Sequence, residues 1–119
     1  MNENRLVDYL DHIRQAAHDA CSFLHGMSKA EFLADKRSQQ AVIMSLIIGE
    51  AVTKVMDRDP AFAAGHSKIP WRNMRGMRNR ITHGYFDINL DVVWETVQQA
   101  LPELLPHLAA ARKDAEGVG

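Results

Sequence analysis

A segment rich in arginine, from Trp71 to Phe86, carries the side chains of this chain that are best suited to chemistry. Its sequence is WRNMRGMRNRITHGYF, which holds four arginines, one histidine and one tyrosine and no aspartate or glutamate. Guanidinium groups bind phosphate oxygens through paired hydrogen bonds, and an imidazole can accept or donate a proton near neutral pH. These residue types together indicate a site for a phosphate-bearing ligand.

The charge of the chain is distributed unevenly along the sequence. Residues 60–86 contain five lysines and arginines and no acidic residue, whereas the rest of the chain contains nine basic residues and fifteen acidic ones. The whole chain is nearly neutral, with a formal net charge of −1. One cationic stretch in such a chain favours a local anionic ligand, such as phosphate or RNA, over bulk coating of nucleic acid or binding to an anionic membrane.

The segment is expected to form a helix over about 71–82, and its polar residues then share one face. At about 100° of rotation per residue, Met74, Met77 and Ile81 lie together on the side that should be buried. Four polar side chains form a continuous strip, which we call the cationic arc: Arg72, Arg75, Asn79 and His83. We expect the two arginines of this arc to bind phosphate. The alternative is that the arc is only a solvated helix face.

Helical periodicity predicts the elements that position this arc. Apolar residues recur at steps of three and four from Leu6 to Leu24, which is typical of an amphipathic helix, and Gly26 is a natural end for it. Ser28 followed by Glu31 has the spacing of a capping box, which predicts that a short helix begins there. Residues 57–70 form a connector that could hold one short helical turn, over 60–64.

A second long helix is expected around residues 42–56, and it is apolar over most of its circumference. Glu50 is the exception on this helix. It is either buried against an arginine or placed at a cleft, and we expect the first arrangement, in which Arg75 or Arg78 is the partner and Glu50 supports the guanidinium.

The ends of the last two helices are predicted from glycine, asparagine and proline. Gly84 could adopt the left-handed conformation that ends the cationic helix. Asn89 is the cap candidate of the final helix, which should kink or restart near Pro102 because proline lacks a backbone donor. Residues 112–119 are expected to form a flexible tail.

These helices predict an all-α fold, an antiparallel bundle of four main helices plus a short helix, in one domain over residues 1–111. The single cysteine, Cys21, excludes an internal disulfide and fits a reducing cytoplasm. We expect neither an exported protein nor a membrane span, because the N-terminus has no leader pattern and no apolar run is long enough. The histidines have no metal-ligand spacing, so we expect no metal site and no cofactor.

The cationic helix also carries a family resemblance. Arg78, Asn79, His83 and Tyr85 stand as R-N-x-x-x-H-x-Y, which resembles the signature of the HEPN superfamily and, through the tyrosine, that of the HepT-type ribonuclease toxins. The resemblance extends over nearly the whole chain, including the segments IIGEAV, IPWRNMRGMRN and VVWETV.

The resemblance implies a toxin that is a metal-independent endoribonuclease, with RNA as its substrate and the RNA 2′-hydroxyl as the nucleophile. His83 would act as general base or acid, and Arg78 would stabilise charge on phosphorus. Asn79 would orient Arg78 or the substrate. The expected products are a 2′,3′-cyclic phosphate and a 5′-hydroxyl.

Arg78 and His83 are about 140° apart on an ideal helix, so one straight helix cannot direct both at one atom. Either the helix distorts near Thr82 and Gly84, or two copies of the motif meet across a two-fold axis. The resemblance favours the second arrangement, a homodimer formed through the cationic helix.

Tyr85 matches the position at which an MNT-type nucleotidyltransferase antitoxin attaches AMP in HepT-type systems. A bulky anion there would repel RNA and block the catalytic pair. The alternative is that Tyr85 and Phe86 only pack the end of the helix.

Two other functions remain open at this point. The chain could be a catalytically silent module that binds a nucleotide or a nucleotidyltransferase, with the cationic arc used only to hold phosphate. It could also be a purely structural dimerisation partner.

Overall fold

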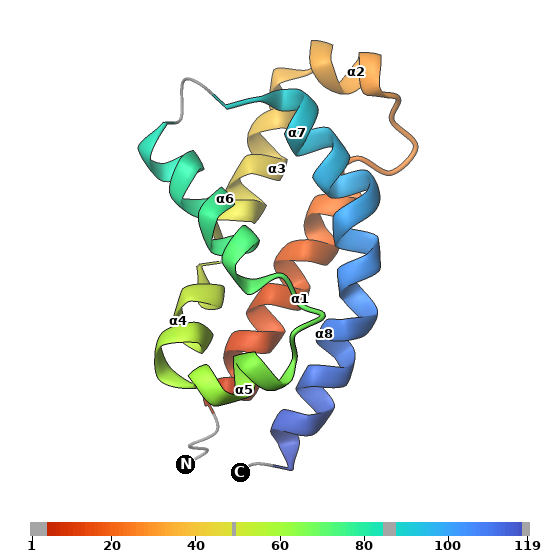
Figure 1. Ribbon diagram of the computed structural model, residues 1–119. Coiled ribbons are helices and arrows are strands. Elements are labelled where there is room, and N and C mark those ends of the chain that lie inside the picture. The colour runs from red at the N-terminus through yellow and green to blue at the C-terminus, as the bar shows by residue number, and fades with distance from the viewer. Residues whose placement is uncertain (1–4, 49, 85–87, 118–119) are drawn as a thin grey trace.

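The computed structural model describes residues 5–48, 50–84 and 88–117, and these residues form an all-α bundle without a strand (Figure 1). The elements are α1 (Arg5–Phe23), α2 (Lys29–Ala34), α3 (Lys36–Ile48), α4 (Ala51–Arg58), α5 (Pro60–Gly65), α6 (Trp71–His83), α7 (Leu90–Glu95), the π-helical segment η2 (Thr96–Ala100) and α8 (Leu101–Glu116). The predicted all-α fold class is confirmed, and α2, α5 and α7 are the short helices, with six residues each.

Helix α1 is the central element of the bundle. It packs against α8 on one side and against α3 and α4 on the other (Figure 1). Leu10, Ile13 and Ala20 on its apolar stripe are almost fully buried. The stripe that was predicted from periodicity therefore forms the core, because burial of apolar area is the main favourable contribution to folding.

The connection from α1 to α2 follows the predicted signals. Gly26 has a φ of 77°, the left-handed conformation that glycine adopts without strain. The hydroxyl of Ser28 accepts a hydrogen bond from the Glu31 backbone at 3.1 Å, and the Glu31 carboxylate accepts one from the Ser28 backbone at 2.8 Å. These bonds from Ser28 hold the pKa of Glu31 below its usual value. The capping box is confirmed.

The expected long helix around residues 42–56 is instead two helices. Helix α3 ends at Ile48 and α4 begins at Ala51, with Glu50 at the N-cap position of α4. The sequence places glycine at position 49, and glycine is unfavourable in a helix interior. The break gives α4 its own direction, and α4 contacts both α1 and α6.

The connector before α6 is fixed by a tryptophan. Trp71, at the first position of α6, is buried, and its indole N–H donates to the backbone carbonyls of Ala63 at 3.0 Å and His66 at 3.2 Å. The imidazole of His66 also lies 3.3 Å from the carboxylate of Asp114 on α8. The start of the cationic helix is therefore attached to α5 and, through the connector, to α8.

The last helix restarts near Pro102, as predicted. The Asn89 side chain caps α7 by accepting from two backbone N–H groups. In η2 the Leu101 N–H donates to the Thr96 carbonyl five residues back. Pro102 has no N–H to continue the usual ladder, and the local shift to π-helical bonding lets α8 begin with the proline in its first turn.

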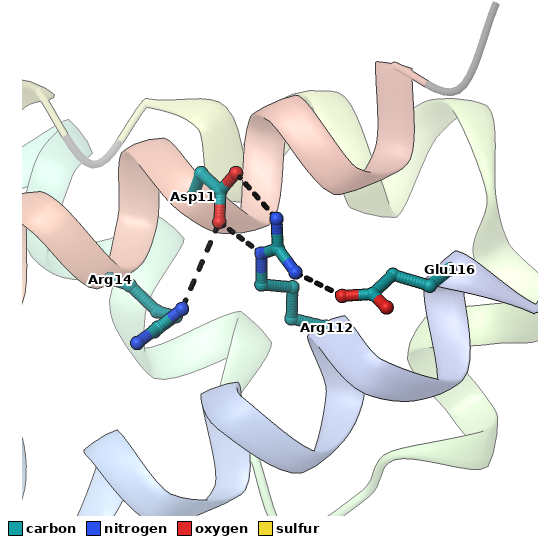
Figure 2. A network of polar contacts seen from close by, with 4 residues as sticks. All are labelled: Asp11, Arg14, Arg112 and Glu116. Carbon is teal, nitrogen blue, oxygen red and sulfur yellow. Dashed lines mark hydrogen bonds and ion pairs between the residues drawn. The ribbon is translucent and has the colours of Figure 1, made fainter.

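The expectation that a flexible tail begins at residue 112 is wrong for residues 112–116. Helix α8 continues to Glu116, and Ala115 is fully buried. Figure 2 shows the reason: the Arg112 guanidinium binds the Asp11 carboxylate of α1 through Nε at 2.5 Å and Nη2 at 3.3 Å, and it also contacts Glu116. Arg14 approaches the same Asp11 carboxylate at 3.9 Å.

Candidate active site

Residues 71–83 of the cationic segment form one regular helix. Helix α6 runs from Trp71 to His83, and the Gly84 N–H donates to the Arg80 carbonyl at 2.8 Å, which continues the i to i−4 ladder to the end. The prediction of a left-handed Gly84 is wrong, because its φ is −137°. A Cβ at this position would lie only 3.2 Å from the Arg80 carbonyl oxygen, so the close approach to the last turn explains the glycine.

The predicted inner side of α6 faces the bundle. Ile81 is buried, and Met74 packs against the core, although Met74 and Met77 remain half-buried. The helix contacts α3 and α4. These contacts leave the opposite side of α6 toward solvent.

The cationic arc lies on that solvent side. Arg72, Asn79 and His83 are exposed, and Arg75 is half-exposed. Arg75 has an ionic contact within the described residues, in which its Nη1 lies 3.5 Å from the Asp57 carboxylate of α4. An exposed ion pair of this kind contributes little to stability, about 0.2–1 kcal/mol. The arc can therefore accept an anion from solution.

Arg78 has a different environment from the arc. Its side chain is half-buried between α6 and α4, and its Nη2 donates to the Thr53 hydroxyl oxygen at 3.1 Å. The Arg78 Nε is covered from solvent and has no hydrogen-bond partner in the described part of the chain. A covered donor without a partner is unusual in proteins, because desolvation without a new hydrogen bond costs free energy.

The geometry excludes one of the two arrangements that the sequence left open for Arg78 and His83, the distorted helix, and leaves the two-fold dimer as a proposal. Both residues lie on the regular part of α6, so their side chains leave the helix about 140° apart. The proposed distortion near Thr82 and Gly84 is not found, because the backbone ladder is intact there. Within one copy of the chain, the Arg78 guanidinium therefore points toward α4 and the His83 imidazole is exposed to solvent.

The expected burial of Glu50 is wrong. Glu50 is exposed at the start of α4. The partner of Arg75 is instead Asp57, about two turns beyond Glu50 along α4, and the partner of Arg78 is Thr53, about one turn beyond Glu50. Sequence reasoning did not identify these two residues, although their four-residue spacing on the polar face of α4 was a signal. Tyr85 and Phe86 lie outside the described residues.

A surface hollow of about 420 Å³ adjoins the N-terminal end of the arc. Arg72 and Asn73 form part of its wall, and the rest is mostly apolar, with Pro60, Ala63 and Ile69 among the lining residues. Neither Arg78 nor His83 lines it. The hollow therefore extends the accessible surface beside the arc and does not enclose the catalytic candidates.

The described residues contain neither a cluster of metal ligands nor a helix suited to a membrane. No three His, Cys, Asp or Glu side chains in the described ranges gather into a group that could hold a metal ion. None of the described helices has the length and apolar character needed to cross a membrane.

Comparison with known proteins decides the family. A family model described as ribonuclease HepT-like matches residues 13–111, which include all of α6. The chain belongs to the HepT-like ribonuclease family. The R-N-x-x-x-H motif of this HepT-like chain lies on α6, at the end of the exposed cationic arc.

Relatives with ribonuclease names cover most of the HepT-like chain. "Probable ribonuclease HepT" of Thermococcus cleftensis is 39% identical over 107 residues, which is 89% of this chain and 94% of that protein. A "Putative RNase" of Caldanaerobacter subterraneus subsp. tengcongensis is 38% identical over 97 residues, 81% of this chain and 84% of the relative. A "Putative RNase" of Methanocaldococcus jannaschii is 36% identical over 113 residues, 94% and 88% of the two chains. No solved structure gives a significant match.

Proposed function

We propose that this HepT-like protein is the toxin of a toxin–antitoxin pair and acts in the cytoplasm as a metal-independent endoribonuclease. The observation that supports this proposal most strongly is the exposed cationic arc, which ends at His83 on the helix that carries the family motif. Such a surface attracts the RNA backbone, and each phosphate contact makes binding more sensitive to salt. Arg72 and Arg75 bind phosphates in this proposal.

The reaction uses the RNA itself as the source of the nucleophile. His83 accepts the proton of the 2′-hydroxyl, the 2′-oxygen attacks phosphorus, and the bond from phosphorus to the 5′-oxygen breaks. A second imidazole donates a proton to the leaving 5′-oxygen, which gives a 2′,3′-cyclic phosphate and a 5′-hydroxyl. Arg78 stabilises the charge on the phosphoryl oxygens, and Asn79 orients Arg78 or the substrate.

The active form in this proposal is a homodimer. The divergence of about 140° between Arg78 and His83 on one helix supports it, because two copies of α6 related by a two-fold axis can place both side chains at one phosphate. Two copies also supply the two imidazoles that the proton transfers require. The dimer doubles the cationic charge around the cleft, which strengthens the attraction of RNA.

Regulation completes the proposal. A nucleotidyltransferase antitoxin transfers AMP from ATP to the Tyr85 hydroxyl and releases pyrophosphate. Tyr85 is two residues from His83 in the sequence, so the added phosphate and its nucleoside would compete with RNA for the arc. Mass spectrometry of the chain co-expressed with such an enzyme should detect one added AMP. Tyr85→Phe should prevent this addition, whereas Tyr9→Phe, which replaces the other tyrosine of the chain, should not.

The catalytic proposal is tested with labelled single-stranded RNA of mixed sequence. We expect the unmodified wild-type chain to cleave it and leave cyclic phosphate ends, and His83→Ala to be at least ~100-fold slower. The exposed His18 on α1 provides the control, because His18→Ala should cleave like the wild type. If neither the wild type nor His83→Ala cleaves RNA or arrests growth, the ribonuclease proposal is refuted and the nucleotide-binding module replaces it.

A further inference from the structure

The guanidinium of Arg78 is held from outside its own helix. Helices α4 and α6 contact each other (Figure 1). Across this contact Arg78 Nη2 donates to the Thr53 hydroxyl oxygen at 3.1 Å. The Arg78 side chain reaches toward α4 from a half-buried position, so the direction of its charged end depends on what α4 presents there.

Thr53 is well placed to fix this direction. Its neighbours Ala51, Val52 and Val55 are buried in the core, so the backbone that carries the hydroxyl is anchored. The threonine itself is half-buried at the edge of α4. A β-branched side chain also has few rotamers in a helix, which limits the positions that its oxygen can take.

The chemistry of the Thr53 contact differs from that of the Asp57 contact one turn later. Asp57 offers a carboxylate, whose negative charge partly compensates the positive charge of Arg75. The hydroxyl of Thr53 accepts a hydrogen bond but carries no charge. The Thr53 contact therefore holds Arg78 without placing a negative charge beside it. A carboxylate at position 53 would instead pair with Arg78 and compete with phosphate.

The remaining donors of Arg78 are consistent with an anionic ligand. A guanidinium has five N–H groups, and the hydrogen bond to Thr53 uses one of them. The Nε–H is covered and has no partner in the described residues. The covered Nε–H is not available to a ligand from solution, but a cation held by a neutral group through one Nη–H has the properties needed to bind a phosphoryl oxygen at a fixed position.

We propose that Thr53 is the positioning residue of the site, and that its hydroxyl directs the Arg78 guanidinium toward the RNA phosphate. The functional part of this proposal rests on the proposed ribonuclease activity. Thr53 does not touch the substrate in it. The residue acts through Arg78, so its removal should reduce the rate of the chemical step more than it weakens substrate binding.

The kinetic test compares Thr53→Val, which keeps the shape of the side chain, with Thr53→Ser, which keeps the hydroxyl. On the labelled mixed-sequence RNA we expect Thr53→Val to lower kcat about 10-fold or more, because a hydrogen bond to a charged group is lost. The KM of this variant should stay within about twofold of the wild-type KM. Thr53→Ser should restore most of kcat. If wild-type RNA cleavage is present and Thr53→Val cleaves equally well, the positioning role is refuted.

The matched control is Thr96→Val. Thr96 is also a half-buried helical threonine, but its hydroxyl donates to the Val92 carbonyl at 2.8 Å within its own part of the chain. Its replacement also removes a hydroxyl, but one that binds Val92 and not Arg78, so kcat should stay within about twofold of the wild type. An equal loss in both valine variants would mean that general destabilisation causes the effect, which would also overturn the proposal.

A second measurement separates this inference from the ribonuclease proposal. The Nε–H signal of Arg78 in a nitrogen-15 spectrum can be assigned by its loss in Arg78→Lys. In Thr53→Val we expect this Nε–H signal to shift and the proton to exchange faster with water. In Thr53→Ser the signal should return to its wild-type position. Both results are expected whether or not RNA is cleaved. If the wild type is inactive but this pattern is found, the ribonuclease proposal fails and the holding of Arg78 by Thr53 stands. An unchanged signal in Thr53→Val refutes that contact.

Discussion

Arg78→Met separates the contribution of this residue to catalysis from its contribution to stability. Methionine keeps an unbranched apolar stem of similar length and removes the guanidinium. The change loses the hydrogen bond to Thr53, which lies at a half-buried position, and a hydrogen bond to a charged group contributes about 1.5–3 kcal/mol. It also removes the covered Nε–H without a partner, whose desolvation costs about 1–3 kcal/mol.

The two contributions oppose each other, so the free energy of unfolding of Arg78→Met should be within about 1 kcal/mol of the wild type. For a chain of this size, 1 kcal/mol corresponds to a change in Tm of about 3–5 °C. The same variant should lose RNA cleavage at least ~100-fold, because the charge opposite the phosphoryl oxygens is gone.

Thermal unfolding followed by circular dichroism, together with the labelled RNA assay, measures both effects. Arg78→Ala is the comparison, since it also removes the apolar stem and should be less stable than Arg78→Met. If Arg78→Met lowers the free energy of unfolding by more than about 2 kcal/mol, then Arg78 stabilises the fold and the account of its covered Nε–H is wrong. If cleavage is retained in Arg78→Met, the catalytic role is wrong.

Two further predictions concern charges around α4. Asp57→Asn removes the carboxylate beside Arg75, so a non-cleavable 2′-deoxy oligonucleotide should bind about twofold more tightly at low salt. This gain in affinity should disappear near ~1 M salt, where the charges are screened. Unchanged affinity at low salt would contradict the role of Arg75 in phosphate binding. Partial burial raises the pKa of Tyr9, but hydrogen bonds and positive charge from Arg58 and Arg5 outweigh it, so the pKa is lowered. Arg58→Gln should therefore move the ionisation of the Tyr9 phenol to higher pH in an ultraviolet titration. Tyr9→Phe identifies which part of the signal comes from Tyr9. If the ionisation does not move in Arg58→Gln, Arg58 does not lower the pKa of Tyr9.

The helices themselves could be predicted well from local sequence signals. The stripe from Leu6 to Leu24, the Ser28 capping box and the Asn89 cap depend on residues within a few positions of one another, and all three are found. The restart at Pro102 was predicted for the same reason, since the missing backbone donor is a property of that residue.

The errors arise where distant segments decide the outcome. Residues 112–116 look polar and frayed in the sequence, but Arg112 binds Asp11, 101 positions away, and that contact continues the helix. Glu50 was expected to be buried because the helix around it is apolar, but the break after Ile48 turns it to solvent. The end of a helix and its tertiary partner cannot be predicted from periodicity alone.

In the candidate site, too, local features could be predicted from the sequence and contacts between helices could not. Which residues of α6 face outward follows from helical geometry, and the exposure of Arg72, Asn79 and His83 agrees with it. The partner of Arg78 does not follow from it, because the relative axial position of α4 and α6 decides whether Thr53 or Glu50 meets the guanidinium. Whether Tyr85 is modified stays a prediction.

The bonds of Trp71 fix the start of α6, and the buried Ile81 fixes the helix near its other end, so both attachments together set the position of His83. The Trp71 indole N–H, at the start of α6, donates to the carbonyls of Ala63 and His66, which precede the helix. His83 follows Trp71 by twelve residues, about 18 Å along the helix axis. A tilt of about 5° at Trp71 would then displace His83 by about 1.5 Å, and misplacement of about 1 Å can cost a reaction ~100-fold. Substitutions near Ala63 or His66 should therefore change the rate of the proposed RNA cleavage without touching the RNA.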